Sequence, residues 1–170
     1  MEFFDAVNAR QSVRAFKPRK IEPEVMTRLL EAMRTAPTAG NLQAYQVYLI
    51  ESPEKIRGLA GAAHGQECVS GAPVVLVFCT DAPRSAKYGS RGRTLYCIQD
   101  VTIAGTIAHL AAAALGLGSV MVGAFDEDEA AKVVGVPSHH RPILMLPVGY
   151  PNETPARTSR RPLDDLVIRM

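Results

Sequence analysis

The feature that most constrains the fold is a continuous apolar run at residues 74–79, which reads VVLVFC. Its short length and its β-branched residues indicate a strand rather than a helix. A strand that has no polar face requires other elements to cover both faces of its sheet. The run therefore predicts a central strand with helices packed on either side of the sheet.

The residues before and after this run show patterns that predict further helices and strands. Pro23 and Pro53 suit the first position of a helix, and apolar residues recur at helical spacing after Pro23. We expect helices over residues 3–9, 23–35, 53–63, 95–115 and 126–134, and strands over 46–50, 74–79, 119–122 and 142–148. Because strands and helices mix without strict alternation, the predicted fold class is α+β around one sheet.

The size and charge of the chain limit its organisation and its partners. A length of 170 residues favours one domain over 1–170, with residues 151–170 as an extended tail rich in proline and arginine. Apolar residues make up 47% and charged residues 21%, which is ordinary for a globular protein. A formal net charge of +2 does not by itself indicate binding to nucleic acid or to a membrane surface, so we expect neither partner.

The composition favours a cytoplasmic location. The three cysteines are widely spaced and form no C-x-x-C pair, so neither a zinc ribbon nor a dithiol redox site is predicted. Such cysteines fit a reducing compartment. The first residues lack the basic and apolar regions of a signal peptide. No apolar run reaches the roughly 18 residues that would cross a bilayer.

The segment Arg10-Gln11-Ser12-Val13-Arg14 carries the first indication of a ligand. Two arginines four residues apart, with a serine between them, can direct guanidinium groups and a hydroxyl at one anion. Arginine matches phosphate oxygens in a two-pronged geometry, and such charge-assisted bonds are strong. The segment alone leaves open the alternative of a solvated loop with surface arginines.

A second segment, residues 36–43, reads APTAGNLQ and follows the expected second helix. Its small residues leave backbone groups accessible, and the amides of Asn41 and Gln43 can both donate and accept hydrogen bonds. These groups suit a flat polar ring. The alternative is a helix-to-strand connection in which Asn41 caps backbone groups.

A third segment, residues 116–125, reads GLGSVMVGAF and follows the long alanine-rich helix. Because its glycines follow a helix and do not open one, the segment is not a dinucleotide-binding fingerprint. Gly123 and Ala124 would let a bulky ligand lie close to the backbone. Gly116 or Gly118 also suits the end of a helix. The small residues of the helix permit close packing on the sheet or against a second subunit.

The order of these segments resembles the nitroreductase family of flavin enzymes. The shared motifs are R-x-S-V-R near the start, A-P-T-A-G-N-x-Q after the next helix, G-L-G-S with G-A-F after the long helix, and P-V-G-Y-P before an arginine-rich tail. The likeness extends from about residue 3 to residue 166. It implies a mixed, mostly antiparallel sheet flanked by helices, and a homodimer with one FMN in each of two sites at the subunit interface.

The resemblance also implies which residues bind the cofactor: Arg10, Gln11, Ser12, Val13, Arg14, Pro37, Thr38, Ala39, Asn41, Gln66, Val122, Gly123, Ala124, Arg160 and Arg161. Segment 10–14 would hold the phosphate and the ribityl chain, and loop 37–41 would come from the other subunit. Gln66 would bond the pyrimidine edge, and residues 122–124 would pack near the ring. A tail arginine would complete the phosphate clamp. Ser159 stands where the family often has a basic residue, so the choice between Arg160 and Arg161 stays open.

The activity that the resemblance implies is the reduction of nitro compounds, quinones or related acceptors by NAD(P)H, through ping-pong hydride transfer at the flavin N5. The cofactor supplies the chemistry, so no catalytic side chain and no metal is expected. His109 is expected to be a packing residue, and His139 and His140 to lie in a loop. The chain is short for the family and lacks the helical insertions that cover the substrate side in longer members.

Three other functions stay open at this stage, because a fold does not fix a function. One is a protein that stores FMN or senses redox state without catalysis. Another is a specialised flavin enzyme of the same family, such as one for dehalogenation or heterocycle oxidation. The third is a globular subunit without a cofactor.

Overall fold

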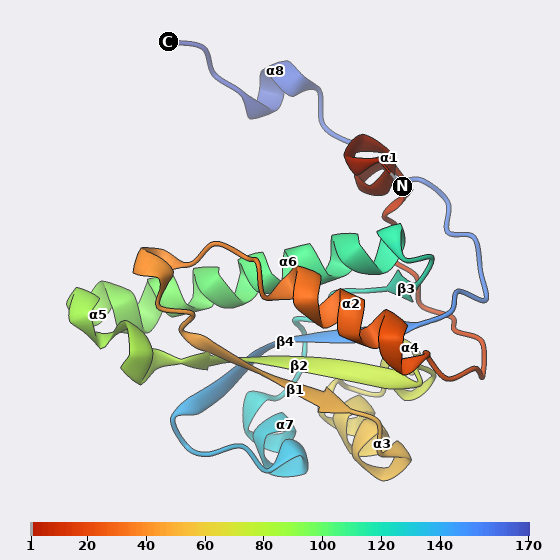
Figure 1. Ribbon diagram of the computed structural model, residues 1–170, viewed down its shortest axis with the longest axis horizontal. Helices are drawn as coiled ribbons and strands as arrows, with labels where there is room; N and C mark the ends of the chain where they lie inside the picture. The colour runs from red at the N-terminus through yellow and green to blue at the C-terminus, as the bar shows by residue number, and fades with distance from the viewer. Residues whose placement is uncertain (1) are drawn as a thin grey trace.

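A computed structural model describes residues 2–170 as an α+β fold around one four-stranded sheet (Figure 1). The strands are β1 (Tyr45–Ile50), β2 (Val74–Asp81), β3 (Gly118–Ser119) and β4 (His140–Gly149), in the order β1-β2-β4-β3. All three ladders are antiparallel. Within the described residues, the parallel pairing is an isolated bridge between Ser12 and Ser119.

The apolar run forms the central strand, as its composition predicts. All eight residues of β2 are buried. Side chains of a strand alternate between its two faces, so Val75, Val77 and Cys79 enter one core while Val74, Leu76 and Phe78 enter the other. The apolar character of both faces is therefore explained by a core on each side of the sheet.

Helices cover both faces of the sheet (Figure 1). On one side lie α3 (Pro53–Ala62), α4 (Glu67–Ser70) and α7 (Glu127–Val134), and on the other lie α2 (Pro23–Met33) and α6 (Cys97–Ala114). The helix ends follow local chemistry. The Ser52 hydroxyl accepts the Lys55 N–H at the start of α3, and the Asp126 carboxylate accepts the Glu129 N–H at the start of α7.

The helical stretch that contains α6 is strongly apolar. By length and composition alone, the helical residues 82–114 could cross a membrane, since an 18-residue window within them has a mean hydropathy of 1.3. The core helix of a globular protein satisfies the same criterion. Here Val101, Ala104 and Ala108 are fully buried in the core between α6, α2 and the sheet. Packing within the fold therefore accounts for the apolar residues of α6.

The predicted strand over 119–122 is wrong in its extent, since β3 ends at Ser119. Val122 still pairs with Met145, but only as an isolated bridge. In this register Val120 faces Pro147, which has no N–H to donate, so the ladder is interrupted there. Residues 122–124 are therefore part of an irregular segment and not of a regular strand.

The ends of the chain lie beyond α6, on the side away from the sheet (Figure 1). They contain α1 (Phe3–Ala9) and, in the extended tail, α8 (Leu163–Leu166). Both ends of the chain carry large apolar side chains in contact with solvent: Phe4 is 76% exposed, Leu163 68% and Ile168 85%. Scattered exposed apolar residues are ordinary, but a concentration on two terminal elements is typical of a surface that binds another chain.

Candidate functional site

The segment 10–14 is extended and runs beside β3. The Val13 N–H donates to the Ser119 carbonyl at 3.0 Å, and Val13 is buried. A Cβ atom at Gly118 would lie 2.6 Å from Val13 Cγ1, so the close approach of the two segments requires glycine at 118. The backbone of the segment is thus held firmly, while Arg14 is exposed and Ser12 is partly exposed.

Arg10 is linked to the core through a buried histidine. Its Nη1 atom lies 3.0 Å from His109 Nε2, and His109 Nδ1 lies 2.6 Å from the Ser119 hydroxyl. Arginine only donates, so Nε2 accepts and Nδ1 carries the proton that His109 donates to Ser119. Burial, with a further contribution from the Arg10 charge, lowers the pKa of His109 to about 4, so the ring is neutral at pH 7.

His109 therefore has the packing role expected from the sequence, and it also orients Arg10. One guanidinium N–H is used in this contact, and the others remain available to an anion. The tail begins beside the same place, where a Glu153 carboxylate oxygen accepts the backbone N–H groups of Arg14 and Ala15. Gln11, His109 and Glu153 are among the residues that line a cavity of about 240 Å³ there.

Gln66 and residues 122–124 come together, as a shared binding surface would require. The Gln66 side chain donates to the Ala124 carbonyl at 2.9 Å. Val122 is buried and exchanges two backbone hydrogen bonds of 2.9 Å with Met145. Gly123 is exposed, and a Cβ atom there would meet no described atom within 4 Å. The backbone at 123 therefore offers an open surface against which a flat ring can lie.

The loop that contains Pro37, Thr38 and Ala39 is anchored by Asp100 of α6. The Asp100 carboxylate accepts the Ala39 N–H at 2.9 Å and the Ala44 N–H at 3.4 Å, and the residue is only 2% exposed. No pattern in the sequence predicted this anchor. The one available signal was a lone carboxylate inside a helix that is otherwise rich in alanine.

The loop also has an internal hydrogen-bond network. Its short 3-10 turn η1 (Ala39–Asn41) contains Gly40 and Asn41 at φ values of 58° and 55°, in the left-handed region. The Thr38 hydroxyl accepts the Gln43 N–H, and the Asn41 carbonyl accepts the Gln43 side-chain amide, both at 3.1 Å. These bonds are consistent with the supporting role predicted for Asn41.

The two halves of the predicted site lie on opposite sides of α6. Loop 37–39 contacts Asp100, and segment 10–14 contacts His109 nine residues later. Nine residues are two and a half helical turns, or about 13 Å along the axis, so the two side chains point in opposite directions. One copy of the chain therefore does not bring both halves around one ligand.

The tail arginines are not brought to segment 10–14 in the described chain. Arg160 Nη1 contacts Thr158 and Ser159, and Arg161 Nη2 donates to the Asp165 carbonyl. The tail extends away from the body (Figure 1). The proposed closing of the phosphate clamp by Arg160 or Arg161 therefore stays a prediction.

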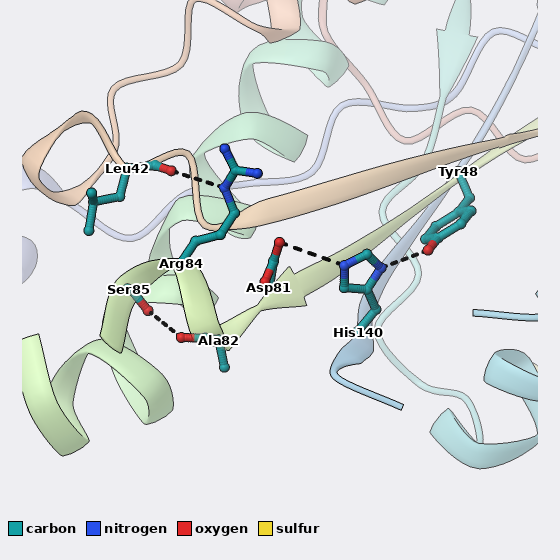
Figure 2. Close-up of polar contacts among 7 residues, drawn as sticks. All are labelled: Leu42, Tyr48, Asp81, Ala82, Arg84, Ser85 and His140. Carbon is teal, nitrogen blue, oxygen red and sulfur yellow. Dashed lines mark hydrogen bonds and ion pairs between the residues drawn. The ribbon is translucent and has the colours of Figure 1, made fainter. Parts of the chain in front are cut away.

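A second feature missed by the sequence analysis is the segment 82–96, which lies beside loop 37–43. It comprises η2 (Ala82–Tyr88), α5 (Gly89–Arg91) and the π-helical turn η3 (Gly92–Tyr96). Arg84 Nε donates to the Leu42 carbonyl at 3.4 Å (Figure 2). Tyr96 and Ile103 are among the residues that line a cavity of about 600 Å³ together with residues 37–39. The segment carries only basic charges: Arg84, Lys87, Arg91 and Arg93.

The groups on segment 10–14, on Gln66 and at Gly123 fit a phosphate-bearing cofactor with a flat ring. Arg10, Ser12 and Arg14 supply two cations and a hydroxyl in one held segment. The Gln66 amide and the open backbone at Gly123 supply polar and close-approach surfaces for a ring. This set is the chemistry that FMN requires of a protein, namely anion binding at one end and hydrogen bonding with stacking at the other.

Comparisons with known proteins agree with this assignment. The sequence profile of the family described as the nitroreductase family matches residues 7–69 and 62–150. The chain is 28% identical to an NADH dehydrogenase of Thermus thermophilus, over 94% of this chain and 91% of that protein. It is 27% identical to an NAD(P)H-type FMN reductase of Bacillus subtilis, over 95% of this chain and 70% of that protein.

The fold is similar to those of solved oxidoreductases. The NADPH:FMN oxidoreductase from Vibrio harveyi in complex with NAD⁺ superposes with a TM-score of 0.90 at 26% identity, over 98% of this chain and 76% of that chain. Nitroreductase A from Vibrio parahaemolyticus gives a TM-score of 0.91 at 25% identity, over 99% and 76%. Sequence profile, relatives and fold agree, and the chain belongs to the nitroreductase family.

Proposed function

We propose that this chain uses NAD(P)H to reduce nitro compounds, quinones or related small acceptors in a ping-pong sequence, with FMN as its cofactor. Membership of the nitroreductase family, together with relatives named FMN reductase, makes it an NAD(P)H-dependent oxidoreductase that binds FMN. The acceptor class and the kinetic order are our own inference. The observation that carries the proposal is segment 10–14, whose two arginines and serine are held against Ser119, in a fold that also leaves the backbone open at Gly123.

When bound, FMN would supply the two-electron chemistry that links NAD(P)H to the acceptor. The residues of this chain bind and orient. Arg10, Ser12 and Arg14 would hold the phosphate, and Arg10 is kept in place by the neutral His109 ring. The amide of Gln66 would bond the ring edge. Nearby positive charge would stabilise the negative charge that develops on reduction.

We assign the segment 82–96 to the side of the flavin on which the substrate would bind. It lies against the loop that bears Pro37, Thr38 and Ala39, and Tyr96 shares their cavity. Its four basic residues have no acidic neighbour between 82 and 99. They would favour acceptors and nucleotides that carry negative charge.

Anaerobic stopped-flow mixing of the FMN-loaded protein with NADH, and separately with NADPH, tests the proposed activity. We expect at least one nucleotide to bleach the flavin absorbance within seconds, because hydride transfer requires only correct positioning of the two rings. Addition of a quinone or nitro compound should then restore the oxidised spectrum. If both nucleotides leave the spectrum unchanged, the protein is better described as a store or sensor of FMN.

We also propose that the functional unit is a homodimer with FMN between the subunits. The proposal is supported by the two halves of the predicted site, which lie on opposite sides of α6 and would be joined around one ligand by a second copy. The exposed residues Phe4, Leu163 and Ile168 provide apolar surface for that copy. On α6, Thr102, Ile103 and Thr106 are exposed, and both threonine hydroxyls donate to carbonyls of their own helix.

Light scattering tests the dimer. We expect the FMN-loaded protein to have twice the mass of the chain, and a variant that lacks residues 156–170 to lose both dimer and flavin. The physical reason is that the tail contributes exposed apolar side chains and the candidate phosphate ligands Arg160 and Arg161. A stable monomer that retains FMN would contradict the interface site.

The buried, free cysteines are consistent with the cytoplasmic location that we propose.

A further inference from the structure

Three potential metal ligands, none of them among the residues assigned to FMN, come together at one end of the sheet. Asp81, His139 and His140 offer ligand atoms that all lie within 4.8 Å of one another. Asp81 is the last residue of β2 and pairs in register with His140, the first residue of β4. On β4, His140 is eight residues from Val148, which pairs with Ser119, or about 27 Å along an extended strand. The cluster is therefore separate from the phosphate half of the site.

The two nitrogen atoms of the His140 ring have different environments (Figure 2). Nδ1 lies 2.7 Å from the Tyr48 hydroxyl, which is a hydrogen bond. Nε2 faces Asp81 Oδ2 at 3.7 Å, which is too long for one. The tyrosine thus fixes the ring so that Nε2 points toward the carboxylate without bonding it.

The Asp81 carboxylate lies at the edge of the core without a close donor. Its side chain is 13% exposed and accepts no hydrogen bond from any residue between 2 and 170. The neighbouring arginines are engaged elsewhere. Arg141 binds Glu127 through two bonds of 2.6 and 2.8 Å, and the Nε atom of Arg84 donates to the Leu42 carbonyl. The carboxylate oxygens therefore remain free to bind a cation beside the His140 ring.

We propose that Asp81, His139 and His140 bind a divalent transition metal ion such as Zn²⁺. Imidazole nitrogen and carboxylate oxygen are ordinary zinc ligands, with bonds of about 2.0–2.2 Å. Two ligands of a tetrahedral ion then lie about 3.4 Å apart, close to the 3.7 Å that separates His140 Nε2 from Asp81 Oδ2. A small shift of either side chain accommodates the ion.

The environment of His140 matches that of a metal-binding histidine in a further respect. Such histidines use the second ring nitrogen in a hydrogen bond that fixes the tautomer and the ring orientation. Tyr48 of β1 provides that bond, so three strands contribute to the cluster. The ion would fasten the turn before β4 to the end of β2. Two histidines and one aspartate leave a fourth position for water.

The sequence predicted no metal ligand because it shows no pattern that joins these residues. His139 and His140 are adjacent, but Asp81 lies far away in the chain. Only the antiparallel register of β2 and β4 places it opposite His140.

Isothermal titration with Zn²⁺ tests the site, on full-length, FMN-loaded protein that carries no histidine tag and has been freed of metal by a chelator. We expect one ion per chain, and a higher melting temperature in the presence of Zn²⁺. His140→Ala and His139→Ala should each weaken binding by at least about tenfold, and Tyr48→Phe by about tenfold through loss of the orienting bond. His64→Asn replaces an exposed histidine outside the cluster and should bind Zn²⁺ like the unmodified protein.

Flavin absorbance provides an independent check in every variant. Because His139 is exposed, its replacement leaves the core intact, and retained FMN would show that the variant is folded. The metal proposal is overturned if the unmodified protein takes up no Zn²⁺, or if His139→Ala and His140→Ala bind it as tightly as His64→Asn does. Either outcome leaves the proposed reductase activity untouched, since Zn²⁺ uptake and flavin bleaching are measured separately.

Discussion

Replacement of Arg14 by alanine is expected to weaken FMN binding by about 1.5–3 kcal/mol, the range for a hydrogen bond to a charged group. That loss corresponds to roughly a ten- to hundredfold higher dissociation constant. Arg14 is exposed at the end of a segment whose backbone is fixed by Ser119 and Glu153. Its guanidinium is therefore available to an anion, while its removal disturbs little of the fold.

Titration of the FMN-free protein with FMN, followed by flavin fluorescence, measures this effect. Arg28→Ala is the matched control, because Arg28 is an exposed arginine on α2 and its loss changes the net charge equally. A weakening of the same size in both variants would mean that only the overall charge matters. An unchanged affinity in Arg14→Ala would refute the role of Arg14 in phosphate binding.

Replacement of Asp100 by alanine is expected to lower the free energy of unfolding by about 3 kcal/mol or more. The carboxylate accepts two backbone N–H groups, and that of the fully buried Ala44 would be left without a partner. Each bond to a charged group contributes about 1.5–3 kcal/mol, and domains are stable by only about 5–15 kcal/mol. The same change should release loop 37–41 and weaken FMN binding.

Urea unfolding at a fixed protein concentration, with and without FMN, separates the two effects. Asp100→Asn keeps one carbonyl oxygen and should cost less than Asp100→Ala. Gln99→Ala replaces the exposed neighbour on α6 and should stay within about 0.5 kcal/mol of the unmodified protein. If Asp100→Ala unfolds at the same urea concentration as Gln99→Ala, Asp100 is not the anchor of the loop.

The sequence predicted those parts of the fold whose cause is local. The run at 74–79 has no polar face, so its side chains are all buried only in a central strand that is covered on both sides. β2 confirms this prediction. The α+β class and the family assignment were likewise confirmed. Helix starts at Pro23 and Pro53 were also correct, because proline acts on the residues next to it.

The sequence could not predict the parts whose cause is tertiary. The segment 82–96 has no apolar periodicity, and its π-helical turn depends on Gly92, where a Cβ atom would overlap the Ser85 carbonyl oxygen. The anchoring of Ala39 by Asp100 joins residues far apart in the chain. For the same reason, the sequence predicted Arg10 as a phosphate ligand without the histidine that orients it.

The placement of segment 10–14 and loop 37–39 on opposite sides of α6 has a consequence for inheritance. In the proposed dimer each site takes segment 10–14 from one copy and loop 37–39 from the other. A mixed dimer of one chain damaged at Arg14 and one damaged in loop 37–39 would concentrate both lesions in one site and leave the other site whole. Two defective alleles of this gene would then complement each other in the same cell.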